Sequence, residues 1–276
     1  MSRPFRQVDV FTTTPYQGNP VAVVLDGTGL DDDAMRRFAR WTNLSETTFV
    51  LPPTSPTADY RVRIFTPSTE LPFAGHPTLG TCHAWLGERP ASARPTQIVQ
   101  ECGVGLVPLR RTADGLAFAA PPLRRSGPVQ GALVARISAM LGIAADDMVA
   151  AEWVDNGPGW VAVLLENAES VLALRPRGVD LPLGVVGPWP PGSATAFEVR
   201  AFVPAGDATV EDPVTGSLNA SLAQWLLRTG RASAPYTASQ GSGLHRAGRI
   251  HISTDADGTV WVAGATVTCL SGTAEL

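Results

Sequence analysis

The sequence predicts an α+β fold made of two similar β-rich halves, each organised around one central helix. The first observation is the stretch Tyr60–Leu86, where Tyr60–Thr66 alternates as a β-strand and the positions after Pro77 recur at helical spacing. The second is that this strand returns at Phe197–Pro204 and is again followed by a helical pattern. A repeat in this order indicates an internal duplication.

The two copies can be aligned residue by residue. The strands correspond at one constant offset, with Val62 matching Val199, Arg63 matching Arg200, Phe65 matching Phe202 and Pro67 matching Pro204. If one residue is lost from the second copy, His76-Pro77 aligns with Asp212-Pro213, Gly80 with Gly216 and Thr81 with Ser217. This alignment predicts that His76 and Asp212 are equivalent. We expect the halves to span residues 1–125 and 126–276, joined by a linker rich in proline and glycine.

Local patterns predict the other elements of the first half. A helix from Gly29 to about Asn43 begins with the acidic residues Asp31–Asp33, which suit an N-cap and a first turn, and it carries an apolar stripe. The central helix begins near Pro77, whose missing N–H is tolerated in a first turn. Strands are predicted at Gln7–Phe11, Val21–Leu25, Thr47–Leu51, Gln97–Leu109 and Gly115–Ala119.

The second half is predicted in the same way. Helices are expected at Leu133–Leu141 and, after the repeated strand, at Leu218–Thr229. The Asp-Gly pairs at Asp114 and Asp257 are typical of hairpin turns. Strands are predicted at Trp160–Leu165, Gly184–Trp189, Tyr236–Ser239, Arg249–Ser253 and Val260–Leu270.

Composition excludes several functions. A net charge of −4 argues against nucleic-acid binding, because nucleic-acid binders normally show a basic face. All 21 basic residues are arginine, so lysine Schiff-base chemistry and a phosphate-loop lysine are excluded. The first residues run directly into a strand, so we expect no signal peptide and no membrane association. Cys82, Cys102 and Cys269 lack metal-ligand spacing, and we interpret them as reduced thiols of a cytoplasmic protein.

Glu46 and His76 are candidate acid–base groups in the first half. Glu46 stands between the end of a helix and an apolar strand, where an enclosed carboxylate is costly unless it is paired, and where enclosure raises the pKa of a carboxyl group. His76 lies between Gly75 and Pro77, at a helix N-terminus whose N–H groups can bind an anion. The alternatives are a capping or salt-bridged glutamate and a histidine that only hydrogen-bonds within its turn.

Asp212 and Ser217 are the candidates in the second half, on either side of Pro213–Gly216. Asp212 could instead cap the following helix, and Ser217 could lie in its first turn. The predicted duplication favours a functional role, because two helix N-termini, each with an acid–base side chain, suit a small carboxylate substrate. The sequence has no serine-nucleophile elbow, no convincing dinucleotide motif and no zinc-protease motif. We therefore expect proton-transfer chemistry without a metal or an organic cofactor.

These motifs resemble the phenazine biosynthesis-like (PhzF) family, and the resemblance extends over essentially the whole chain. It rests on the motifs Gln17–Val23, Asn43–Phe49, Arg63–Pro67, Glu70–Gly80, Asn156–Pro158, Glu211–Ser217 and Gln240-Gly241. The resemblance implies a diaminopimelate epimerase-like fold, with two pseudo-symmetric domains that each form a β-barrel-like sheet around a central helix. It places the active site between the two domains and predicts a homodimer.

The resemblance also implies the chemistry. In the phenazine enzymes a dihydro-hydroxyanthranilate is isomerised by a proton shift, without a cofactor. The family's acid–base glutamate matches Glu46, and its supporting residues match His76, Asp212 and Ser217. We expect groups that bind the substrate at Asn19, Gly75, Gly216, Gln240 and Gly241. This chain differs from the phenazine enzymes at Gly159-Trp160 and Leu218-Asn219.

We therefore predict a cofactor-independent isomerase of a small metabolite that bears a carboxylate. An amino-acid epimerase or racemase is the first alternative. Relatives with that activity use two cysteines, but this chain has Ala74 before Gly75-His76 and Asp212-Pro-Val before Thr215-Gly216. The second alternative is a small-molecule-binding protein that keeps the fold without turnover.

Overall fold

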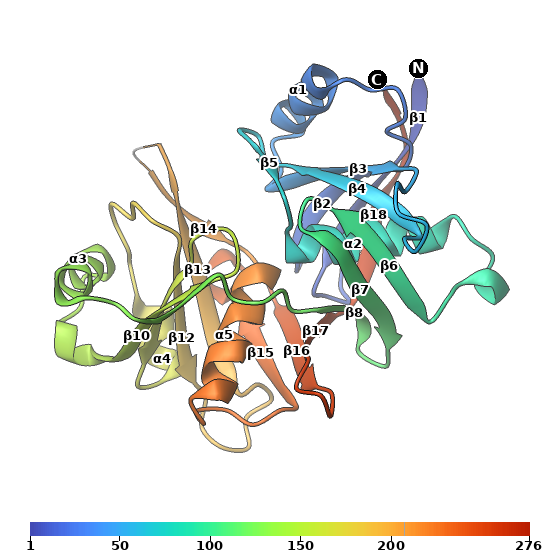
Figure 1. Cartoon of the computed structure of the whole chain (residues 1–276). Helices are drawn as coiled ribbons and strands as arrows, with labels where there is room; N and C mark the ends of the chain where they lie inside the picture. Colours follow the sequence, from blue (N-terminus) through green and yellow to red (C-terminus); the bar gives the residue numbers. More distant parts are fainter. Residues whose placement is uncertain (207) are drawn as a thin grey trace. The chain divides into compact units, whose positions relative to one another are not determined.

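The computed structural model describes residues 1–206 and 208–276 and divides them into two compact units (Figure 1). Unit 1 comprises residues 1–119 and 263–276, and unit 2 comprises residues 120–262. The predicted halves, residues 1–125 and 126–276, put the end of the chain in the second half, whereas the structure puts residues 263–276 in unit 1. Strand β18 (Thr266–Glu275) pairs antiparallel with β1 (Ser2–Val10), and this pairing joins the C-terminal residues to unit 1.

Unit 1 is a mixed sheet in which two parallel pairs interrupt an antiparallel order. β1 also pairs with β2, β2 runs parallel to β3, β3 is antiparallel to β4, and β4 runs parallel to β6. β6 then continues through antiparallel β7 and β8, while the short β5 pairs with the end of β4. The strands are β2 (Asn19–Val24), β3 (Glu46–Leu51), β4 (Tyr60–Phe65), β5 (Glu70–Leu71), β6 (Gln97–Cys102), β7 (Gly105–Thr112) and β8 (Gly115–Ala119).

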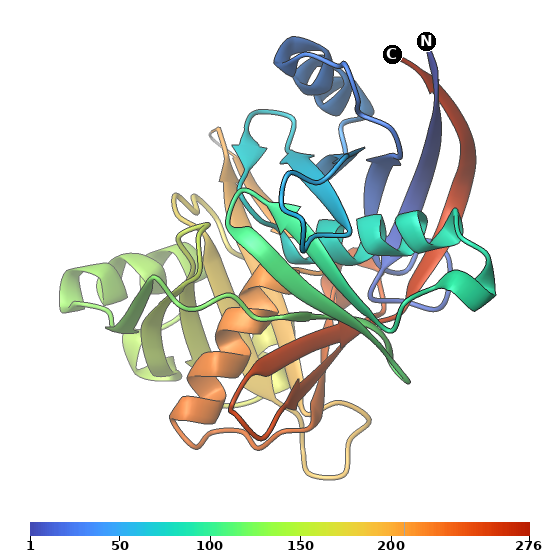
Figure 2. The same ribbon diagram turned by 45° about the vertical axis from the view of Figure 1, so that its right-hand side comes forward.

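The central helix of unit 1 is α2 (Gly75–Gly87), which packs against β1, β2 and β8 (Figure 2). Nearly all of its residues are buried, as expected for a helix with apolar residues on every side. Gly80 allows the close approach, because a Cβ there would lie 2.3 Å from Cγ1 of Val21. The helix is thus held against the sheet on several sides, which gives its N-terminus a defined position.

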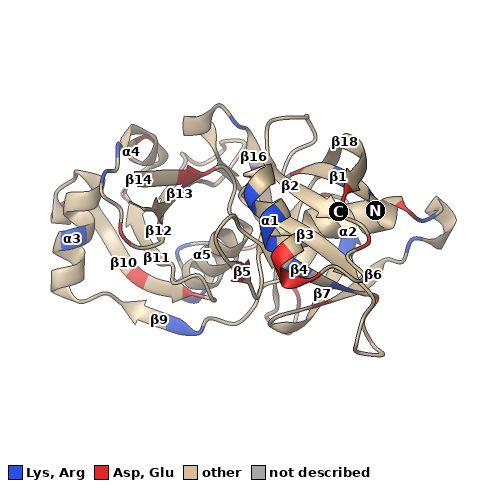
Figure 3. Cartoon of the chain, turned by 90° about the horizontal axis from the view of Figure 1, so that it is seen from above, with Lys and Arg blue, Asp and Glu red and all other residues tan. Residues whose placement is uncertain are grey.

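Helix α1 (Asp32–Thr42) confirms the predicted start and end signals. The Asp31 carboxylate accepts a hydrogen bond from the N–H of Ala34 at 2.7 Å, and Asn43 ends the helix in the left-handed conformation with φ of 53°. Acidic and basic side chains occur together on this helix (Figure 3). Short helices η1 (Ala91–Ala93), η2 (Ala145–Asp147) and η3 (Ser242–Leu244) occur elsewhere in the chain.

Unit 2 repeats the strand order of unit 1. β10 pairs with β9 and with β11, β11 runs parallel to β12, β12 is antiparallel to β13, and β13 runs parallel to β15. β16 is antiparallel to β15, and β14 pairs with the end of β13. The strands are β9 (Arg125–Pro128), β10 (Met148–Asp155), β11 (Val161–Leu165), β12 (Leu183–Pro188), β13 (Phe197–Ala205), β14 (Ala208–Asp212), β15 (Tyr236–Gln240) and β16 (Gly248–Thr254). β17 (Val260–Gly264) begins in unit 2 and ends in unit 1.

The central helix of unit 2 is α5 (Gly216–Arg228), which packs against β10 and β16. Its buried residues Leu218, Leu222 and Trp225 form one core with side chains of the sheet. A Cβ at Gly184 would lie 2.3 Å from Cδ1 of Leu218, so this glycine lets the helix approach β12. The other helices are α3 (Gly131–Leu141), which fits its prediction, and α4 (Ala168–Ala173), between β11 and β12.

The common strand order supports the predicted duplication, but strand register corrects the predicted alignment. Glu70 lies opposite Phe65, and Glu211 lies opposite Phe202, so these two glutamates are equivalent. From there both chains run without a gap into the first residue of a 13-residue helix. His76 is therefore equivalent to Ser217.

It follows that Leu71 is equivalent to Asp212, so the predicted match of His76 with Asp212 was wrong. The second copy has not lost one residue. It has gained four between the matched strands, because eight residues separate Phe202 from Glu211 where four separate Phe65 from Glu70. The extra residues belong to the longer hairpin of β13 and β14. The predicted strand Val260–Leu270 also differs, since it is interrupted at Ala265, between β17 and β18.

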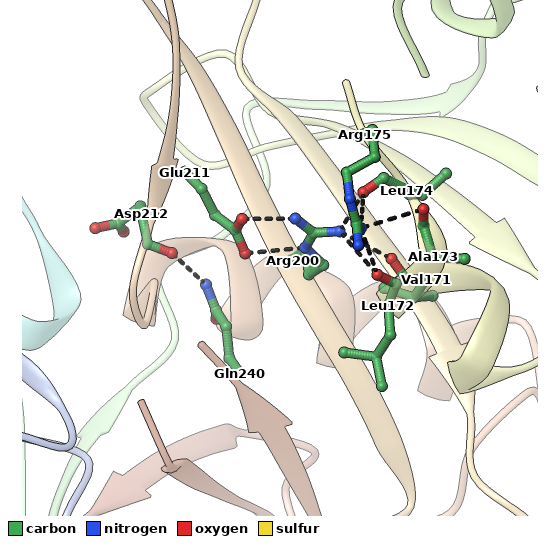
Figure 4. A network of polar contacts seen from close by, with 9 residues as sticks. All are labelled: Val171, Leu172, Ala173, Leu174, Arg175, Arg200, Glu211, Asp212 and Gln240. Atoms are coloured by element: carbon green, nitrogen blue, oxygen red, sulfur yellow. Dashed lines mark hydrogen bonds and ion pairs between the residues drawn. The ribbon is translucent and has the colours of Figure 1, made fainter. Parts of the chain in front are cut away.

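An arginine–glutamate pair holds the same place in both copies. Arg63 contacts Glu70 through Nε and Nη2, at 2.7 and 2.6 Å from the two carboxylate oxygens. Arg200 contacts Glu211 in the same way, at 2.9 and 2.7 Å, and its Nη1 also donates to the backbone carbonyls of Val171, Leu172 and Leu174 (Figure 4). In both units the pair links two neighbouring strands, β4 to β5 and β13 to β14. The second strand of each pair leads into the central helix.

The two pairs should differ in what they contribute to stability. The side chains of Arg200 and Glu211 are 6% and 10% exposed, against 23% and 34% for Arg63 and Glu70. Arg200→Leu leaves a buried carboxylate without its partner, so we expect it to lower the free energy of unfolding by about 3–5 kcal/mol. Arg63→Leu is the comparison in unit 1: it breaks the more exposed contacts of Arg63 with Glu70 and Asp32, and it should cost about 1 kcal/mol. Urea unfolding of both variants measures this difference, and equal losses would contradict it.

Candidate active site

In unit 1, Glu46 and His76 are brought together by a strand and a helix that start side by side. Glu46 is the first residue of β3, and His76 is the second residue of α2. Nε2 of His76 lies 3.1 Å from Oε2 of Glu46, and the two side chains are 4% and 14% exposed. The two atoms are close, but their contact does not meet the geometry of a hydrogen bond. Catalytic contacts often have such geometry before a ligand is bound.

The imidazole of His76 is neutral at physiological pH. Burial lowers its pKa to about 3, and a hydrogen bond to the backbone of Pro20 opposes this shift only in part. The distance to Glu46 alone would suit an ion pair, but the imidazolium form is disfavoured because the ring has lost its contact with water. The pair therefore consists of a neutral ring and a carboxyl group.

Asn19 is the third polar residue of this group. It begins β2, which runs parallel to β3, and its side chain is fully buried. Its amide nitrogen lies 3.4 Å from Nδ1 of His76. The ring therefore contacts Asn19 and Pro20 on one side and Glu46 on the other. A residue predicted as a substrate contact is thus a direct neighbour of the histidine.

In unit 2, Asp212 ends β14, and α5 begins at Gly216. Thr215 is the N-cap residue, but its hydroxyl donates to Oδ2 of Asp212 at 2.5 Å and makes no capping bond to the helix. The N–H groups of the first turn are thus left without a cap from this side chain. An uncapped helix N-terminus suits an anionic group of a ligand.

Ser217, in the first turn of α5, is held by two residues of unit 2. The indole N–H of Trp160 donates to its hydroxyl at 3.1 Å, and the amide of Asn156 donates to its backbone carbonyl at 2.9 Å. Ser217 is 7% exposed and Trp160 is 3% exposed. Because the indole can only donate, the serine hydroxyl accepts there and its own proton remains available for another acceptor.

Gln240 and Gly241, at the end of β15, contact the Asp212–Gly216 turn. Gln240 is fully buried and hydrogen-bonds to Asp212, Thr215 and Asn219. Gly241 has a φ of +95°, and a Cβ there would lie 2.7 Å from the carbonyl oxygen of Pro213. Only glycine fits this contact without strain.

The structure thus groups the predicted residues by unit. Glu46, His76 and Asn19 form one cluster, beside Gly75. Asp212, Gly216, Ser217, Gln240 and Gly241 belong to a second cluster, at the start of α5. Sequence reasoning gave Thr215 and Asn219 no role in the site, although it noted Asn219 as a difference from the phenazine enzymes. Asn219 is buried within an otherwise largely apolar part of α5, and this polar interruption was the available signal.

Comparison with known proteins identifies the family. The family model described as phenazine biosynthesis-like protein, PhzC-PhzF, matches residues 8–272. The chain is 36% identical to antisense-enhancing sequence 1 of Schizosaccharomyces pombe, over 97% of each chain. It is 38% identical to the trans-2,3-dihydro-3-hydroxyanthranilate isomerase of Pseudomonas aeruginosa, over 80% of this chain and 78% of the relative.

A solved structure shares the fold. The Bacillus anthracis phenazine biosynthesis protein of the PhzF family superposes with a TM-score of 0.84 over all of both chains, at 23% identity. The predicted α+β, diaminopimelate epimerase-like fold is thereby confirmed. In the described part of the chain, no helix is long and apolar enough to cross a membrane. Together, the sequence and fold matches show that this chain belongs to the phenazine biosynthesis-like PhzF family and is an isomerase of that family.

Proposed function

We propose that this isomerase acts on a small metabolite that bears a carboxylate and a conjugated ring or double bond, by moving a proton from one carbon to another. The observation that carries the proposal is the contact of Glu46 with the buried, neutral His76. A carboxyl group enclosed next to a neutral imidazole is a suitable base for a carbon acid. The name of the Pseudomonas aeruginosa relative makes trans-2,3-dihydro-3-hydroxyanthranilate the first compound to test as substrate.

In this proposal Glu46 removes the proton and returns it to another carbon. The same group can serve both steps because removal leaves Glu46 protonated and ready to act as the acid. A neutral imidazole has one N–H and one acceptor nitrogen. Nε2 of His76 can therefore donate to the carboxylate or accept from the carboxylic acid, according to the tautomer of the ring. His76 would hold Glu46 in one orientation in both of its protonation states.

Asp212 and Ser217 would bind the polar substituents of the substrate. The charge that develops when a carbon loses its proton is stabilised by preorganised donors. The first-turn N–H groups at Gly216 and Ser217, and the hydroxyl of Ser217, are suitable donors. The Asp212 carboxylate would accept from an amino or hydroxyl substituent. Metal or organic cofactors have no role in this proposal.

The epimerase or racemase alternative, as the cysteine-using relatives carry it out, needs thiolate bases. The protonation state of the three cysteines therefore decides whether it is available. All three lie in unit 1. Burial raises the pKa of Cys82 to about 12, and burial also raises the pKa of Cys102 and of Cys269. Protonated thiols are poor bases at neutral pH. Ala74 and Thr215, which precede the first residues of α2 and α5, also leave these helix N-termini without a thiol.

Glu46→Gln should keep the shape of the site and remove its base. We expect it to bind trans-2,3-dihydro-3-hydroxyanthranilate within a few-fold of the parent affinity and to lose about 10²-fold or more in kcat, the usual scale for general acid–base catalysis. Glu88→Gln is the matched control, because Glu88 is an exposed glutamate of unit 1 that pairs with Arg6. Turnover and calorimetric binding are measured on the same preparations.

This assignment would be overturned if Glu46→Gln turned over at near the parent rate. If Asp212→Asn or His76→Gln then abolished turnover while binding persisted, the base would be one of those residues instead.

His76 should make the protein less stable in acid. Its pKa falls from an ordinary 6.5 to about 3 on folding. Between these values the unfolded chain binds a proton that the folded chain does not, so the free energy of unfolding falls as pH falls, by about 1.4 kcal/mol per pH unit. We expect His76→Gln to remove this contribution to the pH dependence of the free energy of unfolding. Between pH 7 and pH 4.5, the parent should lose about 2–3 kcal/mol more than the variant in urea unfolding. Equal losses would show that His76 takes up its proton in the folded state.

Replacing all three cysteines should have little effect on turnover. The variant Cys82→Ala/Cys102→Ala/Cys269→Ser tests the racemase alternative, since a thiol mechanism would lose all activity. We expect kcat to remain within about tenfold of the parent, a barrier change below about 1.4 kcal/mol. Circular dichroism verifies that the variant is folded. A larger loss in a folded variant would favour thiol chemistry.

A further inference from the structure

A directed hydrogen-bond chain in unit 2 ends on the carboxylate of Asp212. The backbone N–H of Thr215, which can only donate, points to Oε1 of Gln240 at 3.0 Å. The backbone carbonyl of Asp212, which can only accept, lies 3.2 Å from Nε2 of Gln240 (Figure 4). These two backbone groups determine which end of the Gln240 amide is oxygen and which is nitrogen. A second donor, the amide of Asn219, also reaches Oε1, at 2.8 Å.

The direction of the next bond follows from this. Nε2 of Gln240 donates its other hydrogen to the hydroxyl of Thr215 at 2.9 Å. The hydroxyl has one proton, and Oδ2 of Asp212 accepts it at 2.5 Å. Gln240, Thr215 and Asn219 are 0%, 6% and 2% exposed, so water does not compete for these groups. Both ends of the Gln240 amide are already bonded to protein groups.

The duplication shows that the fold does not need this chain of bonds. Leu71 and Ala74 of unit 1 are equivalent to Asp212 and Thr215 of unit 2, because β5 and β14 pair with the preceding strand in the same register. The place of Gln240 is taken by Cys102, since Tyr60 pairs with Gln100 as Phe197 pairs with Ala238. In each unit the next residue is a glycine packed on the proline of the turn.

At the place of Asn219, unit 1 has Thr78, which accepts a hydrogen bond from Gln100 instead. The turn of unit 1 therefore forms with apolar residues at the places of Asp212 and Thr215. Both units bury a glutamine beside the central helix, but Gln100 bonds to Thr78 and Tyr60, whereas Gln240 bonds to the turn residues Asp212 and Thr215. The turn can therefore form without the residues Thr215 and Gln240, which in unit 2 serve the Asp212 carboxylate.

We infer that Gln240 and Thr215 are positioning residues that hold the Asp212 carboxylate in the orientation in which it binds substrate. The inference rests on the role proposed for Asp212. Gln240 acts through Thr215 and does not itself contact the substrate. Asn219 holds the Gln240 amide in the required orientation. This assigns Gln240 a different role from the substrate contact that the family resemblance implied.

The test uses Thr215→Val, which is nearly isosteric and removes only the hydroxyl that donates to Asp212. With trans-2,3-dihydro-3-hydroxyanthranilate as probe, we expect about a tenfold loss in kcat/KM, and restoration to within about twofold in Thr215→Ser. Thr195→Val is the matched control, since Thr195 is a buried threonine of unit 2 that contacts Ser239 and should leave kcat/KM unchanged. In an Asp212→Asn background, Thr215→Val should have no further effect. Multiplying losses in the double variant would overturn the inference, because a merely structural hydroxyl acts independently of Asp212.

A second readout does not depend on turnover. In crystal structures of Thr215→Val and of Gln240→Met, we expect the Asp212 carboxylate to rotate away while the backbone of β14 and α5 stays in place. An unchanged carboxylate in a folded variant would overturn the inference, even if the protein proved inactive on the probe. An inactive parent whose carboxylate still rotates in the variants would instead contradict the proposed substrate and leave the positioning role supported. If Gln240→Met does not fold, Thr215→Val and Thr215→Ser decide the question.

Discussion

The structure depends on one repeated junction, in which a strand turns sharply into the N-terminus of a buried helix. Two contacts hold the junction in each unit. One is the bidentate arginine–glutamate pair at the strand end. The other is a glycine pressed onto the proline of the turn, where a Cβ on Gly103 or Gly241 would come within 2.7 Å of Pro72 or Pro213. Because these contacts fasten the backbone, the residues of the turn can change without loss of the fold.

The two copies carry different residues at this junction. Unit 1 keeps apolar residues at the turn and presents a histidine from the helix to a glutamate on a neighbouring strand. Unit 2 has the acid in the turn itself and supports it with buried amide and hydroxyl groups. In the account proposed here, a neutral imidazole beside a carboxyl group serves proton transfer, and an oriented carboxylate beside a helix N-terminus serves binding. Each role follows from its local surroundings, as is usual where one reaction needs groups of different proton affinity.

Much of the fold could be predicted from the sequence because repeated strands and nearby helical patterns are local signals. The strand Tyr60–Phe65 and its repeat, the caps of α1 and the two central helices are examples. The alignment of the copies could not be predicted in the same way. Hairpin length depends on which residues pair across the turn, and only the pairing of Phe65 with Glu70 and of Phe202 with Glu211 revealed it.

The candidate site shows the same division. Glu46 and His76 could be singled out from the sequence because each lies at the start of a regular element, and the structure brings their side chains into contact. The contacts of Thr215 and Asn219 could not be predicted, because their partner Gln240 reaches them through the register of β15, which is a tertiary property. Two departures from the phenazine enzymes also have structural roles. Trp160 donates to Ser217, and Leu218 fills the space beside Gly184.

The most direct test of the central claim is turnover of trans-2,3-dihydro-3-hydroxyanthranilate in D₂O, followed by proton NMR and mass spectrometry. Proton transfer by one enclosed carboxyl group predicts a shifted double bond and a product with at most one deuterium, at its new C–H bond. Exchange at the carbon that bears the amino group, with no shift of the double bond, would indicate an epimerase. A compound that binds but neither exchanges nor rearranges would contradict catalysis of this substrate by the Glu46–His76 pair.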